Sequence, residues 1–546
     1  MTTTLAPRPS PAPAPARATH GALAGTGRLL RVALRTDRWT TAIWAVAVAG
    51  IAQSSVVAVA DLYATPADRA ARAALITSPA ATALAGPGYG TDDYTVGAMT
   101  ANELGLWLMV PVAVMALLAV ARHLRAPEED GRLELVRAQP VGRAAPVVAG
   151  LLAATTGVLV VGVVLLGALL TTGLDPAGSV LLVASVVSAA LVLASATAVA
   201  AQLTAHARTA ASLGMAALGV AFALRAVGDV QAPRGASVWT WLSPFGWAQA
   251  TAPYTLDRWW PLALGAGAVT VNVLVAALLV RRRDIGTGLL PERTGPARGR
   301  LPGVLGLAWR RGRTSALAWT AGVVGTGVLV GLLASAVVDL LTDEPDLAAV
   351  LGDPADAAGV ALSLYVVLLA VLTAAYAASA VGTARADETS GRAVLLLALP
   401  VGRVRWLGAQ VALAALASAG MLLVAGLVMG VGAAATLDDP GQVGRVLGAA
   451  AVALPGALVV LGVATAVLGL VPRASAVVWL YVAYVGTVGL FGGLLPEGAD
   501  ALSPFAHLPS PLLGPVAAGP VLAVTGVAVL LVTAGLAGAR RRDLDG

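Results

Sequence analysis

Two segments of the chain repeat one set of charged and turn-forming residues. The first reads EEDGRLELVRAQPVGR at 128–143, and the second reads ETSGRAVLLLALPVGR at 388–403. In each, a Glu precedes Gly-Arg by three residues, and Pro-Val-Gly-Arg ends the segment. The pattern predicts a short helix after the Gly that stops before the Pro. A carboxylate then lies near the start of each short helix and an arginine at the start of the next span, and such charged groups could hold a docked partner protein.

The residue types that are missing exclude several classes of chemistry. The chain has no Cys, so disulfides, iron–sulfur clusters and Cys nucleophiles are excluded. It also has no Lys, which excludes Schiff-base chemistry and the phosphate-binding Lys of a P-loop. The four His are scattered along the chain. We therefore expect no metal site and no catalytic residue.

The composition is that of a membrane protein. Of 546 residues, 58% are hydrophobic and 12% are charged, whereas a soluble protein has about 25% charged residues. Long apolar runs rich in Ala, Leu and Gly indicate helices rather than barrel strands. We expect an all-α polytopic membrane protein with about twelve transmembrane helices, at 40–60, 103–121, 145–171, 179–202, 212–229, 260–280, 315–338, 361–382, 407–435, 446–470, 476–495 and 518–538.

Basic and acidic loops alternate between these predicted spans. Arginines gather before the first span and after the second, sixth and twelfth, whereas the intervening loops carry Asp and Glu. The excess of arginine on alternate loops places those loops and both termini in the cytoplasm. The net charge of +6 reflects this anchoring face, and no nucleic-acid partner is expected.

The chain also repeats itself over longer distances. The segment 28–44 resembles 303–319, while the two Gly-Arg segments and the two Ser-Pro-Phe motifs at 243 and 503 are both 260 residues apart. This duplication predicts two homologous six-helix halves in parallel orientation, with a transport site at their interface. The expected divisions are a disordered, cytoplasmic Pro/Ala-rich tail (1–27), a first half (28–283), a cytoplasmic linker (284–302) and a second half (303–546).

Positive-inside anchoring accounts for the arginines of the two Gly-Arg segments. It does not explain why Glu, Gly and Pro recur at one spacing, whereas docking of a symmetric partner does. The halves differ where Asp130 corresponds to Ser390 and Glu134 to Val394. We therefore hypothesise that the two docking sites differ in strength.

These motifs resemble those of type-2 ABC exporter permeases. The likeness covers residues 28–543 and is greatest to the fused, twelve-span group found beside multidrug and polyketide-antibiotic (tetronasin-type) resistance systems in actinobacteria. It implies a location in the plasma membrane of a bacterium, elbow helices on the membrane at 23–38 and 304–313, and a coupling helix after the second span of each half. Two copies of a separate cytoplasmic ATPase would be the partners and would bind ATP and Mg, with no cofactor in this chain. The resemblance assigns coupling roles to Glu128, Gly131, Arg132, Glu134, Pro140, Arg143, Glu388, Gly391, Arg392, Pro400 and Arg403.

The alternative is an ion-coupled secondary transporter of the major-facilitator type. Such a carrier needs ionisable residues inside the membrane, but Glu103, Asp229 and Asp339 fall at or near span ends. We interpret Arg225, near the outer end of the fifth span, as a snorkelling side chain. A third class, a membrane enzyme, would need clustered acids or His at a membrane face.

The cargo is expected to be a hydrophobic or amphipathic small molecule, such as a drug or antibiotic, because the predicted pathway is largely uncharged. Aromatic and Met side chains provide adaptable walls for such a pathway. The candidates are Trp107, Met109, Met115, Met215, Phe222, Tyr365, Tyr376, Tyr481, Tyr484 and Phe491. The predicted function is thus a membrane permease subunit that exports drugs and lacks an ATPase site of its own.

Overall fold

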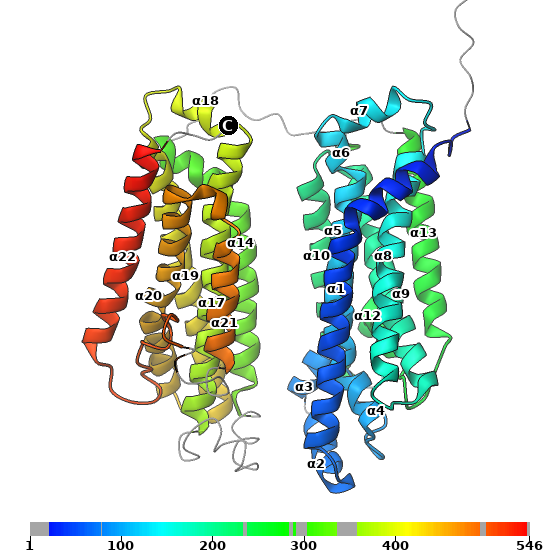
Figure 1. The fold of residues 1–546 in the computed structure, drawn as a ribbon. Coiled ribbons are helices and arrows are strands. Elements are labelled where there is room, and N and C mark those ends of the chain that lie inside the picture. The colour runs from blue at the N-terminus through cyan, green and yellow to red at the C-terminus, as the bar shows by residue number, and fades with distance from the viewer. Residues whose placement is uncertain are drawn as a thin grey trace, which may run out of the picture. The chain divides into compact units, whose positions relative to one another are not determined.

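The computed structural model describes residues 21–77, 79–232, 237–282, 288–290, 303–335, 357–491, 498 and 500–542. Within these ranges the chain contains helices and no strands. It divides into two compact units, residues 1–294 and 295–546, which are considered one at a time (Figure 1). Most of the expected tail and of the expected linker lies outside the described residues. The predicted boundaries of the two halves stay a prediction.

Unit 1 is built on six long helices that pack into one apolar core. Helices α5 and α9 form its centre, with α8, α10 and α13 against α9 and with α1 against α8. Close approach depends on small residues: a Cβ on Gly265 of α13 would lie 2.2 Å from Ser188 Oγ of α9. The long helices are α1 (Thr26–Leu62), α5 (Gly105–Leu124), α8 (Ala145–Leu170), α9 (Pro176–Leu203), α10 (Ala207–Gln231) and α13 (Pro261–Arg282).

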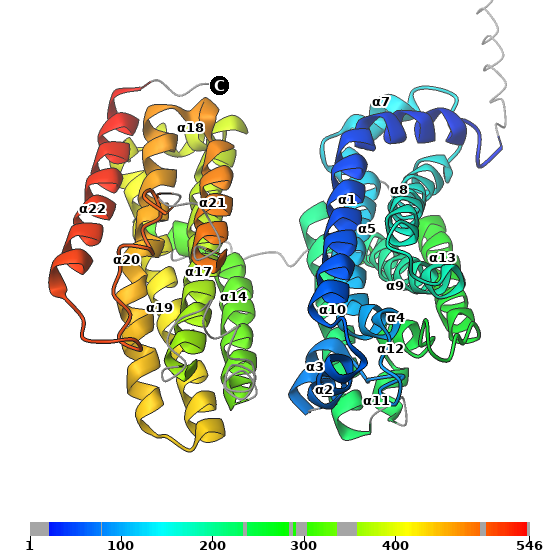
Figure 2. The same cartoon turned by 60° about the horizontal axis from the view of Figure 1, so that its bottom comes forward.

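In each unit, the end of the bundle that carries the short helix after Gly131 or Gly391 is here called the loop end. In unit 1 the loop end holds α6 (Ala126–Glu129) and α7 (Arg132–Arg137). The first turns of α1 bend across this end, as Figure 2 shows. The opposite end holds α2 (Pro66–Ile76), α3 (Pro79–Ala85), α4 (Val96–Met99), the π-helical turn η1 (Thr100–Leu104), α11 (Val238–Trp241) and α12 (Pro244–Gln249).

Unit 2 is a second helical bundle, in which α19 packs against α14 and α20 packs against α22. Glycines bring the backbones of α20 and α22 together, since a Cβ on Gly469 would lie 1.9 Å from the carbonyl oxygen of Gly535. Its loop end holds α18 (Arg392–Leu397) and the last turn of α22. The other helices in the described part of this unit are α14 (Gly303–Leu332), α17 (Ala357–Thr389), α19 (Arg403–Leu437), α20 (Gly441–Leu470), η3 (Pro472–Ala474), α21 (Val477–Phe491) and α22 (Ala518–Arg541).

The membrane class is confirmed. Among the described residues, eleven helices are long and apolar enough to cross a membrane, and α21 is a shorter apolar helix. The predicted span 476–495 contains α21, which has 15 described residues, and residues 492–495 of that span lie outside the described residues. The repeated Ser-Pro-Phe motifs place Phe245 and Phe505 in the buried part of their units.

Candidate functional site

Helix α7 presents one apolar side chain to the surroundings. Gly131 precedes it with φ +72°, and no atom lies within 4 Å of a Cβ built there, so backbone conformation alone favours glycine. Leu133 is buried beneath the helix, whereas Leu135 is 74% exposed. The helix ends at Arg137, before Pro140, as predicted.

Helix α18 has the same geometry in unit 2. Gly391 precedes it with φ +72°, Ala393 is buried beneath it, and Leu395 is 74% exposed. The helix ends at Leu397, ahead of Pro400. An apolar side chain therefore projects from the same turn of both short helices, outside the long apolar helices.

The two repeated glutamates face inward. Glu128 accepts a hydrogen bond of 2.6 Å from Arg125, which is fully buried and also donates to the carbonyl oxygen of Ala201 in α9. Glu388 pairs with Arg385 at 3.3 Å and with Arg542 at 2.5 Å. These carboxylates fix the loop onto the bundle and leave the exposed surface to α7 and α18. The sequence analysis missed Arg125 and Arg385, although both precede the repeated Glu by three residues.

The remaining predicted coupling residues lie around these short helices. Arg132 pairs with exposed Asp130 at 2.5 Å, whereas its equivalent Arg392 reaches buried Asp387 at 3.2 Å. Arg403 donates to the backbone carbonyl of Arg542. Four further predicted coupling residues are exposed: Glu134, Pro140, Arg143 and Pro400. The coupling roles stay predictions.

An ion pair joins the first helix of each unit to the loop end. In unit 1, Asp37 of α1 contacts His123 Nε2 at 2.5 Å and Arg122 at 3.3 Å, both on α5. In unit 2, Arg311 of α14 donates two hydrogen bonds to the carboxylate of Asp387 on α17. We call these contacts latch 1 (Asp37, His123, Arg122) and latch 2 (Arg311, Asp387).

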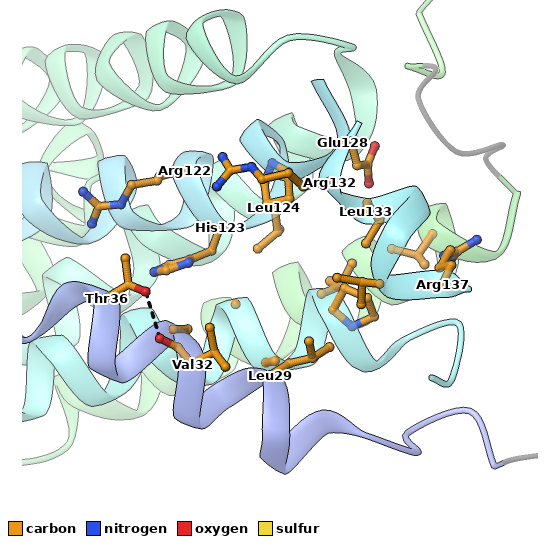
Figure 3. A pocket seen from close by; sticks show the side chains of 18 of the residues that line it. Leu29, Val32, Thr36, Arg122, His123, Leu124, Glu128, Arg132, Leu133 and Arg137 are labelled. Carbon is orange, nitrogen blue, oxygen red and sulfur yellow. Dashed lines mark hydrogen bonds between the residues drawn. The ribbon is translucent and has the colours of Figure 1, made fainter. Parts of the chain in front are cut away.

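A cavity of about 300 Å³ opens beside latch 1, between the start of α1 and the helices α5, α7 and α8. Leu29, Val32 and Thr36 of α1 face Leu124 and Leu133 across it (Figure 3). Four arginines, two carboxylates and one histidine also line it: Arg122, Arg132, Arg137, Arg143, Asp37, Glu128 and His123. Apolar side chains and guanidinium groups thus both line the cavity.

Arg225 is buried, so its interpretation as a snorkelling residue is wrong. Its side chain is 0% exposed and donates to the carbonyl oxygens of Thr82 and Ala83, at the C-terminal end of α3. It also pairs with Asp229 at 3.6 Å, and Asp229 accepts a 2.7 Å hydrogen bond from Thr240. Arg225 therefore ties α3 and α10 together at the end of unit 1 opposite the loop end.

Glu103 lies in a second polar cluster at that opposite end. It pairs with Arg72 of α2 at 2.7 Å and accepts a hydrogen bond from Tyr94 at 3.2 Å. Burial and the nearby Glu103 carboxylate raise the pKa of Tyr94. Both clusters thus serve to hold the short helices in place. Asp339 lies outside the described residues.

The predicted pathway residues lie in different surroundings. Met109, Met115 and Tyr376 are buried in their cores, whereas Trp107 and Met215 are 62% and 44% exposed. Phe222 stacks with Arg225 at 4.9 Å. Tyr481 and Tyr484 stack at 6.1 Å and both bond to the backbone of Leu502. Tyr365 is half-buried, and the side chain of Phe491 lies outside the described residues. Their pathway role stays a prediction.

Comparison with known proteins identifies a relative along nearly the whole chain. The multidrug efflux system permease protein Rv1217c of Mycobacterium tuberculosis (strain ATCC 25618 / H37Rv) is 34% identical over 540 residues, covering 97% of each protein. The family model described as multidrug efflux system permease Rv1217c, C-terminal domain, matches residues 301–540.

Proposed function

Because the chain belongs to the family of multidrug efflux system permeases represented by Rv1217c, we propose that it is the membrane subunit of an ATP-driven exporter. A separate ATPase, present in two copies, docks on α7 and α18 and supplies the energy. The chain itself has no Lys and therefore no Walker A lysine. ATP and Mg would bind to the partner.

The observation that carries this proposal is the pair of matched, exposed leucines. Leu135 and Leu395 each expose 74% of their surface at the same turn of a short helix, beside a buried Arg–Glu pair that fixes the loop. Apolar side chains that enter pockets of a partner supply much of the binding energy of an interface. A partner with two identical grooves would fit two such helices.

The direction of the chain in the membrane is part of the same proposal. The loop end of unit 1 carries the arginines of 122–143, and the loop end of unit 2 carries those of 385–405 and 540–542. The positive-inside rule puts these ends in the cytoplasm. Both termini then lie on the side where ATP is available.

We propose hydrophobic or amphipathic drugs as the cargo, since the name of the mycobacterial relative describes multidrug efflux. An ion-coupled secondary transporter is less favoured, because Glu103 and the Arg225–Asp229 pair hold short helices in place. They are therefore poor candidates for a proton relay.

The test replaces both leucines by Asp and measures copurification of the ATPase and ATP-driven drug efflux in lipid vesicles. Because each buried anchor contributes on the order of 2 kcal/mol, the double variant is expected to lose at least tenfold in ATPase affinity. Efflux is expected to fall in parallel.

Leu502→Asp is the matched control. Leu502 is 75% exposed and lies between α21 and α22, where its backbone bonds to Tyr481 and Tyr484 of α21 rather than to α18. We expect it to leave ATPase binding unchanged. Full drug transport by the permease alone, driven by a proton gradient, would contradict the proposal and favour the carrier.

A further inference from the structure

The cavity beside latch 1 is lined both by apolar side chains, here called its floor, and by guanidinium groups. Its floor includes Leu29, Val32 and Val147, from the first turns of α1 and α8. Its four arginines outnumber its two carboxylates. A volume of about 300 Å³ is at the lower end of the range for small-molecule sites.

The equivalent part of unit 2 indicates that the cavity of unit 1 accommodates an anion. The segments 28–44 and 303–319 correspond at an offset of 275 residues, so Thr36 corresponds to Arg311; the loops correspond at 260, so Pro127 corresponds to Asp387. Thr36 and Pro127 both line the cavity, whereas Arg311 and Asp387 form latch 2. Unit 2 thus provides a carboxylate of its own where unit 1 has Pro127.

The arginine that follows the repeated Gly also indicates that an anion fits the cavity of unit 1. Arg392 reaches the buried carboxylate of Asp387, which is 3% exposed. Its equivalent Arg132 lines the cavity and pairs with Asp130, which is 54% exposed. An anion in the cavity of unit 1 would hold the position that the Asp387 carboxylate holds in unit 2.

We propose that this cavity binds the phosphate of an anionic phospholipid, with the first part of an acyl chain on the apolar floor. Guanidinium groups such as those that line the cavity bind phosphate through charge-assisted hydrogen bonds. Leu29 and Val32, near the start of a helix that continues as a membrane span, place the apolar floor next to lipid. Basic pockets between transmembrane helices suit such headgroups.

Only the choice of leaflet rests on the function proposed above. With the loop end in the cytoplasm, the lipid comes from the inner leaflet. The bound lipid would then bridge α1 and α7, and so link the composition of the membrane to the position of the docking helix.

The binding test uses the full-length permease without the ATPase, so that its failure leaves the docking proposal untouched. The purified protein is titrated with phosphatidylglycerol or phosphatidylcholine, and retained lipid is counted by native mass spectrometry. We expect one phosphatidylglycerol to be held at a half-saturating concentration at least tenfold below that of phosphatidylcholine. Equal retention of the two lipids overturns the proposal.

Two variants locate the lipid in the cavity. Ala33→Trp fills the cavity from α1, and its matched control Ala308→Trp makes the same change at the equivalent position of α14. We expect only the first to lose the tightly held lipid. The double variant Thr36→Arg with Pro127→Asp, which gives unit 1 the pair of unit 2, is expected to lose it as well. Unchanged retention by this double variant and by folded Ala33→Trp overturns the site.

Inorganic phosphate distinguishes the headgroup from a whole lipid. At the same concentration as phosphatidylglycerol, it is expected to displace less than a tenth of the bound lipid, because it lacks the apolar part that fills the floor. Complete displacement by phosphate alone overturns the assignment to a lipid.

Discussion

The two latches join the same pair of helices with opposite polarity. In latch 1 the acid, Asp37, lies on the first helix and the bases lie on α5; in latch 2 the base, Arg311, lies on the first helix and the acid, Asp387, lies on α17. Each joins the first helix of its unit to the span that precedes the short helix, α7 in unit 1 and α18 in unit 2. The comparison shows that an ion pair of either polarity can join the first helix of a unit to the span before its short helix.

The two latches also differ in their access to water. The side chain of Asp387 is 3% exposed and that of Asp37 is 12% exposed. Removing one member of a buried pair leaves the other charge without its counter-ion in a poorly solvated place. Latch 2 should therefore be the more sensitive to loss of its acid.

Asp387→Asn should give the largest change in stability. A buried pair broken on one side costs about 3–5 kcal/mol, but the side chains of Arg311 and Arg392 are 40% and 57% exposed. We therefore expect about 2 kcal/mol, seen as a melting temperature lowered by roughly 5 °C. Asp37→Asn, which leaves the half-exposed Arg122, should cost about half as much.

The measurement is thermal unfolding of the purified variants, with Asp68→Asn as the control for an exposed carboxylate at the opposite end of unit 1. The double variant Arg311→Asp with Asp387→Arg gives latch 2 the polarity of latch 1. It should recover part of the loss. A larger loss for Asp37→Asn than for Asp387→Asn would reverse the ranking of the latches.

Gly131→Ala and Gly391→Ala should have smaller and equal effects. Both glycines have φ +72° and open space around the missing Cβ, so the cost is backbone strain of about 1–2 kcal/mol in each. Asn, which tolerates this conformation better, should recover part of it in both units.

Equal destabilisation by the two Ala substitutions would show that the two loops share one backbone conformation despite their different side chains. The variants are compared by thermal unfolding and by ATPase copurification. Ala at only one position being tolerated at no cost would show that the loops differ in conformation.

The sequence predicted the fold better than it predicted the surroundings of the site. The helices, the Gly before each short helix and the helix ends ahead of Pro140 and Pro400 all follow from local rules of backbone geometry. The inward direction of Glu128 does not, because it depends on Arg125 and on the packing of α5 against α9. A local pattern cannot show which face of a short helix is covered.

Contacts between distant residues were the least predictable. The latches join residues 76 to 86 positions apart, and Arg225 meets the end of α3 more than 140 residues away. The sequence of one predicted span does not show which distant residue an arginine on that span will contact. The duplication offered one usable signal that was not exploited: Arg125 and Arg385 recur at the offset of the glutamates.

The smallest expected effect concerns the unequal strength of the two docking sites. Around Leu135 the exposed residues include Asp130 and Glu134, whereas Leu395 is next to Val394, which is 53% exposed. Asp130 pairs with Arg132, but the exposed carboxylate of Glu134 adds electrostatic attraction to a basic group of the partner, and salt screens this attraction. The docking site of unit 1 should therefore depend on ionic strength more than that of unit 2.

Single variants separate the two sites. With Leu395→Asp only the loop of unit 1 remains intact, and ATPase binding should weaken about threefold between about 0.05 and about 0.5 M NaCl. With Leu135→Asp only the loop of unit 2 remains, and binding should change by less than half that factor. Glu134→Gln in the Leu395→Asp background should remove most of the salt dependence. Equal dependence at both sites would mean that Glu134 takes no part in docking and that the two apolar side chains alone decide it.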